Sequence, residues 1–188
     1  MKKHGLIYNP VSGHALFKGK LDLLIEMFQR HDILLCPYRT RGGKQDDLGR
    51  FLREVHPDGV LAAGGDGTVH AVVNAMLESE TDVPLGILSS GTSNDFATHL
   101  GIQGDWESYI ERIAADESRR VDLGILDGHG KYFVNVVSAG MLTGIAHEVK
   151  SAYKNTLGKV AYYLKGIGEL PRLRSFSVQI TADGACMM

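Results

Sequence analysis

A chain of 188 residues is long enough to bury one complete hydrophobic core and to begin a second domain. Its formal net charge of −2 and its 20 scattered basic residues provide no electrostatic footprint for a nucleic acid, so we expect no nucleic-acid partner. Two cysteines do not make a disulfide framework. The sequence shows neither a signal-peptide pattern nor an apolar run of membrane-spanning length, so a cytoplasmic location is expected.

Up to residue 125 the chain alternates between short apolar runs and amphipathic patterns. Strands are predicted over 6–8, 33–38, 59–63 and 84–88. Helices are predicted over 15–31, 45–55, from Thr68 onward, 95–100 and 106–115. Because strand and helix alternate with short loops, we predict a three-layer α/β domain with a mostly parallel sheet and helices on both faces.

Each predicted strand ends in a loop rich in glycine and hydroxyl residues. The four loops are Asn9–Gly13, Thr40–Gly43, Gly64–Thr68 and Ser89–Asp95. Ligands of open parallel sheets bind beyond the carboxyl ends of the strands. One such loop would mean little, but four on the same edge predict a binding site.

The loop Gly64-Gly65-Asp66-Gly67-Thr68 lies between a strand and a helix. Glycines let the backbone approach a ligand closely, and a helix N-terminus offers free N–H groups, so this corner suits a phosphate. Asp66 is a candidate for holding a divalent metal, and Thr68 for capping the helix or contacting a phosphate oxygen. The alternative is that Gly64 and Gly65 only form a tight strand-to-helix turn.

Two better-known phosphate motifs do not account for this corner. The chain contains no GxxxxGK[ST] sequence, which excludes a P-loop. The third position of the dinucleotide fingerprint is His70 instead of glycine or alanine. Once these two motifs are excluded, the remaining interpretation is that a glycine turn of another kind binds a triphosphate.

Gly91-Thr92-Ser93-Asn94-Asp95 is a second candidate anion site. Thr92 and Ser93 supply hydroxyl donors, and Asp95 is suited to holding a metal or positioning a hydroxyl. The alternative is that Ser93 or Asn94 simply caps the following helix.

The first loop, Asn9-Pro10-Val11-Ser12-Gly13, contains two turn-promoting dipeptides and is open to the same two interpretations. It either forms only a turn or brings Asn9 and Ser12 to the nucleotide, since it follows the first strand.

After Arg119 the pattern changes. Strands over 120–126 and 132–137 flank Asp127–Gly130, which favours antiparallel pairing. A helix is predicted over 157–170 and a half-buried strand over 176–181, followed by the turn Asp183-Gly184. The short arm after this turn buries its face poorly, so we interpret the sequence as a truncated fragment.

Together these residues resemble the diacylglycerol kinase catalytic-domain family, in particular its bacterial soluble lipid kinases. The specific matches are NPVSG at 9–13, GGDGTVHAVVNAM at 64–76 and GTSNDFA at 91–97. Supporting matches are VDLG at 121–124, FVNVVSAG at 133–140 and LGKVAYYLKGI at 157–167.

The resemblance implies a kinase that uses ATP and Mg²⁺ to phosphorylate a lipid hydroxyl, diacylglycerol-like or phosphatidylglycerol-like, during peripheral association with a membrane. It implies a nucleotide-binding domain over 1–125, with a fold similar to phosphofructokinase and NAD kinase. Residues 126–188 would form a linker and the start of a truncated β-sandwich that binds the lipid. The family's catalytic base would lie beyond this chain, so the fragment itself is expected to be inactive, and its exposed interdomain face to permit self-association.

Asp66 is the candidate for metal binding and for stabilising the transferred phosphate. The predicted ATP-binding residues, from the resemblance and from the loops, are Asn9, Ser12, Thr40, Gly64, Gly65, Asp66, Gly67, Thr68, Gly91, Thr92, Ser93, Asn94 and Asp95. An NAD-kinase-like or sphingoid-base kinase is a second enzymatic interpretation, because GGDGT is shared among related kinases. A nucleotide-binding module without activity is the non-enzymatic one.

Overall fold

The computed structural model describes residues 1–12, 17, 19–41, 46–91, 93–102, 105–126, 130–137, 180–182 and 185–187. The chain divides into two compact units, Met1–Val137 and Ser138–Met188. The first unit contains a sheet of four parallel strands in the order β2-β1-β3-β4. The strands are β1 (Lys2–Tyr8), β2 (Ile33–Arg39), β3 (Gly59–Gly64) and β4 (Leu85–Ser89).

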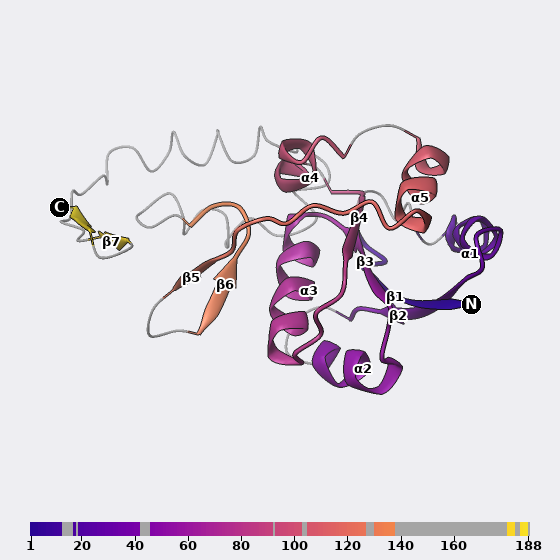
Figure 1. The fold of residues 1–188 in the computed structure, drawn as a ribbon, viewed down its shortest axis with the longest axis horizontal. Coiled ribbons are helices and arrows are strands. Elements are labelled where there is room, and N and C mark those ends of the chain that lie inside the picture. The colour runs from indigo at the N-terminus through magenta and orange to yellow at the C-terminus, as the bar shows by residue number, and fades with distance from the viewer. Residues whose placement is uncertain are drawn as a thin grey trace. The chain divides into compact units, whose positions relative to one another are not determined.

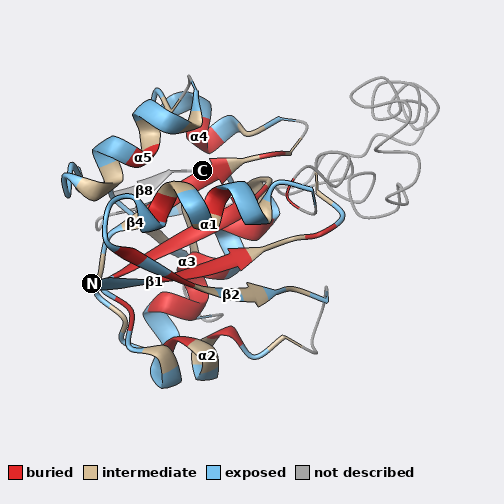
Figure 2. Ribbon diagram, turned by 90° about the vertical axis from the view of Figure 1, so that its right-hand side faces the viewer, coloured by how far each residue is buried: buried red, intermediate tan, exposed pale blue. Residues whose placement is uncertain are grey.

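Helices cover both faces of this sheet (Figure 1). Successive strand residues point to opposite faces. Ile7 therefore packs toward α2 (Leu48–Val55), α3 (Asp66–Glu78) and α4 (Asp95–His99), while its neighbour Leu6 packs toward α1 (Leu21–Gln29) and α5 (Trp106–Ala114). In Figure 2 the buried residues run along the sheet and the inner sides of the helices. The predicted three-layer α/β architecture is confirmed.

The start of α3 differs from the prediction. The helix begins at Asp66, with Gly65 in an extended conformation at the N-cap position. The amide of Thr68 donates to the carbonyl of Gly65 at 2.9 Å, so Thr68 already lies in the first turn. The prediction that Thr68 caps this helix is wrong, because the backbone of a glycine occupies the capping position.

A two-stranded antiparallel sheet, β5 (Gly124–Leu126) with β6 (Lys131–Phe133), confirms the predicted pairing, and its turn at 127–129 lies outside the described residues. Asn74 attaches this hairpin to α3. Its side-chain oxygen accepts from the amide of Tyr132 and its nitrogen donates to the Tyr132 carbonyl, both at 3.0 Å. The buried carboxamide thus pairs with β6 as a neighbouring peptide group would.

In the second unit β7 (Ile180–Ala182) pairs antiparallel with β8 (Ala185–Met187), as predicted. The helix predicted over 157–170 and the turn at 183–184 lie outside the described residues. Within the described part of the chain, no helix is both long and apolar enough to cross a membrane.

His4 is a buried titratable group on β1. Its side chain is 4% exposed, and among the described residues its Nδ1 has no hydrogen-bond partner. The ring packs beside Phe28 and against Gly59, where a Cβ would lie 2.9 Å from the His4 Nε2. Burial lowers the pKa of His4 below its usual value of 6.5, against the opposing pull of the Asp58 carboxylate.

We predict that acidification destabilises the fold through His4. The unfolded chain takes up this proton as the pH falls through 6.5, while the folded chain keeps the imidazole neutral to lower pH. The contribution of His4 to the free energy of unfolding is therefore complete at pH values above the unfolded pKa. It decreases as the pH drops below that value and stops decreasing once the pH is below the folded pKa. Urea titrations between about pH 7.5 and 5.5 should show this loss in the wild type and a smaller one in His4→Leu. Equal pH dependence in both proteins would refute the assignment.

Candidate functional site

The four glycine- and hydroxyl-rich loops begin at one edge of the sheet. All four strands are parallel, and the register places Tyr8 beside Arg39 and Ala63, and Gly64 beside Ser89. The strands therefore end level with one another, which confirms the predicted common edge.

Three backbone hydrogen bonds continue the sheet by one residue beyond the strand ends. The amide of Thr40 donates to the carbonyl of Tyr8, that of Asn9 to Ala63 and that of Ser90 to Gly64, at 2.9, 2.9 and 3.0 Å. These bonds fix the position at which each loop leaves the edge.

The first backbone amides of α3, those of Asp66 and Gly67, lie at this edge and have no acceptor within the helix. Gly67 is exposed, and a Cβ added there would meet no described atom within 4 Å. Thr68 is 8% exposed and lies over Gly64, where a Cβ would fall 2.2 Å from the Thr68 Oγ1. The corner thus has donors of the kind that an anion requires.

Asn94 closes the turn that follows β4. Its side-chain oxygen accepts from the amide of Gly91 at 2.8 Å and its nitrogen donates to the Gly91 carbonyl at 2.9 Å. Asn94 has a left-handed backbone, φ 52° and ψ 41°, and occupies the N-cap position of α4. Among the described residues its side chain makes no capping bond, so its polar group serves the turn. Ser93 is exposed, and Thr92 lies outside the described residues.

Asp66 joins this turn to α3. One carboxylate oxygen accepts from the amide of Asp95 and the other from the amide of Phe96, both at 3.2 Å. Asp66 therefore occupies the capping role at the start of α4 that Asn94 leaves open.

The glycine loops of β3 and β4 are in backbone contact. A Cβ built on Gly91 would lie 2.6 Å from the Cα of Gly65, and one built on Gly65 would lie 3.1 Å from the Cα of Gly91. The hydroxyl of buried Ser90 donates to that of Ser12 at 3.2 Å, which brings the first loop to the same point. Three of the four loops thus form one connected site.

Two predicted residues have other surroundings. The side-chain oxygen of Asn9 accepts from the amide of Val11 at 3.1 Å, so Asn9 stabilises its own turn. Thr40 lies at the end of β2, which β1 separates from β3. Within the described part of the chain no hydrogen bond joins its side chain to the other three loops.

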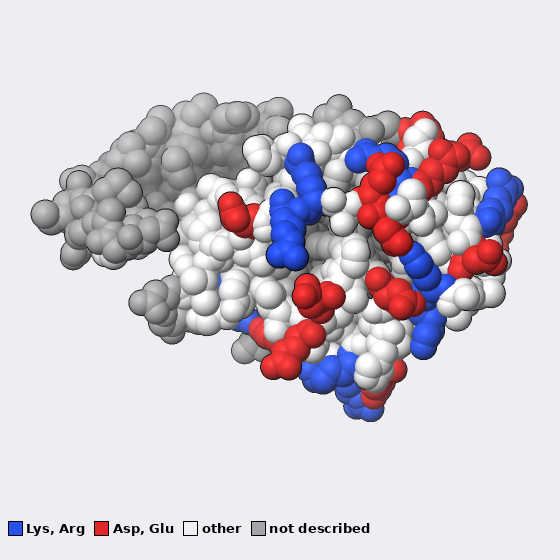
Figure 3. All heavy atoms as spheres, viewed as in Figure 1, with Lys and Arg blue, Asp and Glu red and all other residues white. Residues whose placement is uncertain are grey.

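Charged side chains and possible metal ligands give no separate sign of a site. On the face shown in Figure 3, positive and negative side chains are interspersed. In the described ranges no three His, Cys, Asp or Glu side chains gather in a way that could hold a metal ion. Both oxygens of Asp66 are already engaged by backbone amides, an arrangement that fits a helix cap better than a metal ligand.

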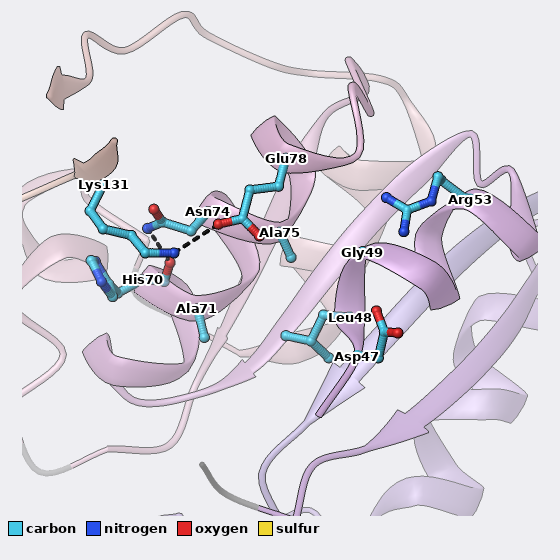
Figure 4. Close-up of a pocket in the computed structure, with 10 residues that line it drawn as sticks. All are labelled: Asp47, Leu48, Gly49, Arg53, His70, Ala71, Asn74, Ala75, Glu78 and Lys131. Carbon is cyan, nitrogen blue, oxygen red and sulfur yellow. Dashed lines mark hydrogen bonds and ion pairs between the residues drawn. The ribbon is translucent and has the colours of Figure 1, made fainter. Parts of the chain in front are cut away.

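A separate hollow of about 460 Å³ lies between α2, α3 and β6 (Figure 4). Lys131 and Glu78, which form an ion pair at 2.8 Å, line it together with Asn74. Its lining residues are Asp47, Leu48, Gly49, Arg53, His70, Ala71, Asn74, Ala75, Glu78 and Lys131. None of them is a predicted site residue, so the candidate site is at the sheet edge and not in this hollow.

Comparisons with known proteins agree on one family. The model of the diacylglycerol kinase catalytic domain matches residues 3–126. Diacylglycerol kinase of Bacillus subtilis (strain 168) is 36% identical over 192 residues, which are 98% of this chain and 61% of the relative. Diacylglycerol kinase of Staphylococcus saprophyticus is 36% identical over 185 residues, covering 97% of this chain and 59% of the relative.

A solved structure is also similar. The crystal structure of a diacylglycerol kinase from Bacillus anthracis str. Sterne has a TM-score of 0.63 and 27% sequence identity. The match covers 99% of this chain and 60% of that one. The chain therefore spans between 59 and 61% of the length of these three relatives.

The contact between the glycine loops predicts opposite effects of two alanine substitutions. Gly91→Ala places a methyl group against the backbone of Gly65, where nothing can rotate away, and should lower the free energy of unfolding by about 1–3 kcal/mol. Gly67→Ala adds a methyl in open space within a helix and should leave stability unchanged or raise it by up to ~1 kcal/mol. Urea titration of both variants checks this. Equal stability of the two would contradict the close approach.

Proposed function

The chain belongs to the diacylglycerol kinase catalytic domain family, and we propose that it is the nucleotide-binding part of a kinase that transfers the γ-phosphate of ATP to a lipid hydroxyl. The observation that carries the proposal is the meeting of three loops at the carboxyl edge of the sheet, beside the first amides of α3, which have no acceptor within their helix. Such an edge is the usual ligand position of an open α/β sheet.

In this proposal the backbone of α3 binds the phosphates. Asp66 and Gly67 supply N–H donors at the positive end of a 13-residue helix, which favours an anion. Gly67 carries no side chain that would keep the phosphate at a distance. The enzyme would then act mainly by positioning and by charge stabilisation, as phosphoryl transfer requires little covalent help.

Hydroxyl and amide side chains around the α3 corner complete the proposed contact set. Ser12 and Thr68 lie next to the glycine turn, and Ser93 lies on the exposed side of its loop. The remaining proposed nucleotide contacts are Asn9, Thr40, Gly64, Gly65, Gly91, Thr92, Asn94 and Asp95.

Mg²⁺ accompanies ATP in the proposed reaction and would neutralise phosphate charge when bound. It is commonly held by one or two carboxylates together with the phosphates, so a protein cage of three ligands is not needed. Each oxygen of Asp66 already accepts an N–H bond from α4, so we propose that Asp66 serves as a helix cap and not as one of those ligands.

The acceptor is proposed to be a diacylglycerol-like or phosphatidylglycerol-like lipid, reached by peripheral association with a membrane. The curated relatives are diacylglycerol kinases of which this chain spans 59 to 61%. We propose that the catalytic base and most of the lipid pocket belong to the region that those relatives have in addition. The division into a domain over 1–125 and a lipid-binding part from 126 stays a prediction, as does self-association.

The full-length protein with labelled ATP and Mg²⁺ tests the acceptor. We expect label in a diacylglycerol or phosphatidylglycerol and none in NAD or sphingosine, because the family match is to diacylglycerol kinases. Label in NAD or sphingosine would favour the second enzymatic interpretation. ATP binding without transfer to any acceptor would favour a nucleotide-binding module.

A matched pair of glycines tests the nucleotide position. Gly67 and Gly49 are each the second residue of their helix, α3 and α2. Gly67→Ala should lower kcat/KM by about tenfold or more, because its methyl group lies over the proposed phosphate donors. In Gly49→Ala the nearest described atoms to the new methyl group belong to the flexible end of Arg53, and kcat/KM should stay unchanged. Equal activity of both variants would refute the proposal that the phosphate binds at the start of α3.

A further inference from the structure

The first turn of α4 receives its cap from a distant residue. The first amides of any helix lack acceptors within the helix, and the N-cap side chain normally supplies one. Here Asn94 holds that position but bonds to Gly91, and the carboxylate of Asp66 accepts from Asp95 and Phe96 instead. The capping group therefore comes from the start of another helix, 29 residues earlier than Asp95.

We infer that Asp66 is a positioning residue, which holds the Gly91–Asn94 turn against α3, and not a ligand of the metal. The inference rests on the proposed function, because it assigns how one residue of that site acts. Both oxygens of Asp66 are used in the two bonds to α4, at 3.2 Å each. Its role is then to keep one loop of the site in register with another.

The remaining contacts of this turn explain why the bonds from Asp66 matter. Two hydrogen bonds from Ser90 fix the beginning of the turn. Its amide donates to the carbonyl of Gly64 at 3.0 Å, and its hydroxyl donates to the hydroxyl of Ser12 at 3.2 Å. At its end, where α4 starts, the described hydrogen bonds to α3 are the two made by Asp66. Loss of the carboxylate removes both and uncaps two helix amides, while the buried side chains of Phe96 and Ala97 still pack in the core beside α3.

The arrangement also decides which amides remain for a phosphate. Those of Asp95 and Phe96 are engaged by Asp66, and that of Gly91 by Asn94. The amides of Asp66 and Gly67 at the start of α3 have no acceptor within their helix. Asp66 thus takes up the first two amides of α4, while the first two amides of α3 remain for the proposed phosphate.

Hydrogen exchange on the 188-residue chain, without nucleotide or Mg²⁺, tests the cap. In Asp66→Ala the Phe96 amide should lose about tenfold in protection, the effect typical of losing an N-cap, and Thr98 should lose protection with it. Asp66→Asn, which keeps one acceptor oxygen, should fall between this variant and the wild type. Asp95→Ala is the matched control: it removes a neighbouring carboxylate that makes no hydrogen bond within the described residues, and Phe96 should keep its protection. Unchanged protection in Asp66→Ala would overturn the inference.

Binding to the full-length protein separates a positioning residue from a metal ligand. If Asp66 positions the turn, Asp66→Ala weakens binding of ATP measured with EDTA, and the Mg²⁺ concentration for half-maximal activity stays within about twofold of the wild type. Unchanged metal-free binding with about a tenfold higher Mg²⁺ requirement would identify a ligand and overturn the inference. Failure of the wild-type protein to bind ATP would refute the proposed function, while hydrogen exchange would still decide whether Asp66 caps α4.

Discussion

The close approach of two backbones, at Gly65 and Gly91, is the constraint on which the candidate site depends. A methyl group on Gly91 would lie 2.6 Å from the Cα of its partner, a distance that real Cβ contacts essentially never reach. Strands about 4.8 Å apart carry their side chains above and below the sheet, whereas a Cβ on either glycine would point at the backbone of the other, so this contact requires residues without side chains. The glycines permit this contact, and the level ends of β3 and β4 bring the loops to it.

The helix α3 transmits this geometry to the rest of the unit. Its N-terminus carries the amides of the candidate site, its buried side packs on the sheet, and Asn74 in its middle binds the backbone of β6. A buried carboxamide with all its bonds made is strongly directional, since each lost partner leaves a polar group without water. The hairpin is therefore fixed relative to the same helix that positions the glycine loop.

The sequence predicted the order of the elements because their apolar periodicity is local. It predicted the common edge because parallel strands must end on the same side. It was wrong about the start of α3. The N-cap residue is Gly65, which has no side chain that could indicate a cap, whereas Thr68 is a residue type that often caps helices. The sequence could not predict the hydrogen bonds between residues that are far apart along the chain. Asp66 meets α4 across 29 residues, and Asn74 meets Tyr132 across 58, and no spacing rule connects such pairs.

The roles of Asp66 and Asn94 imply where acceptor selectivity must lie. Both side chains are engaged in holding loops together, so in the proposed function the phosphate would bind to backbone amides at α3. Backbone amides recognise charge and shape in a phosphate but carry no information about the molecule that will receive it. A corner built in this way can serve kinases with different acceptors. In the proposed function, selection of a lipid over a soluble hydroxyl would then come from side chains outside the three connected loops, in elements that approach the same edge of the sheet.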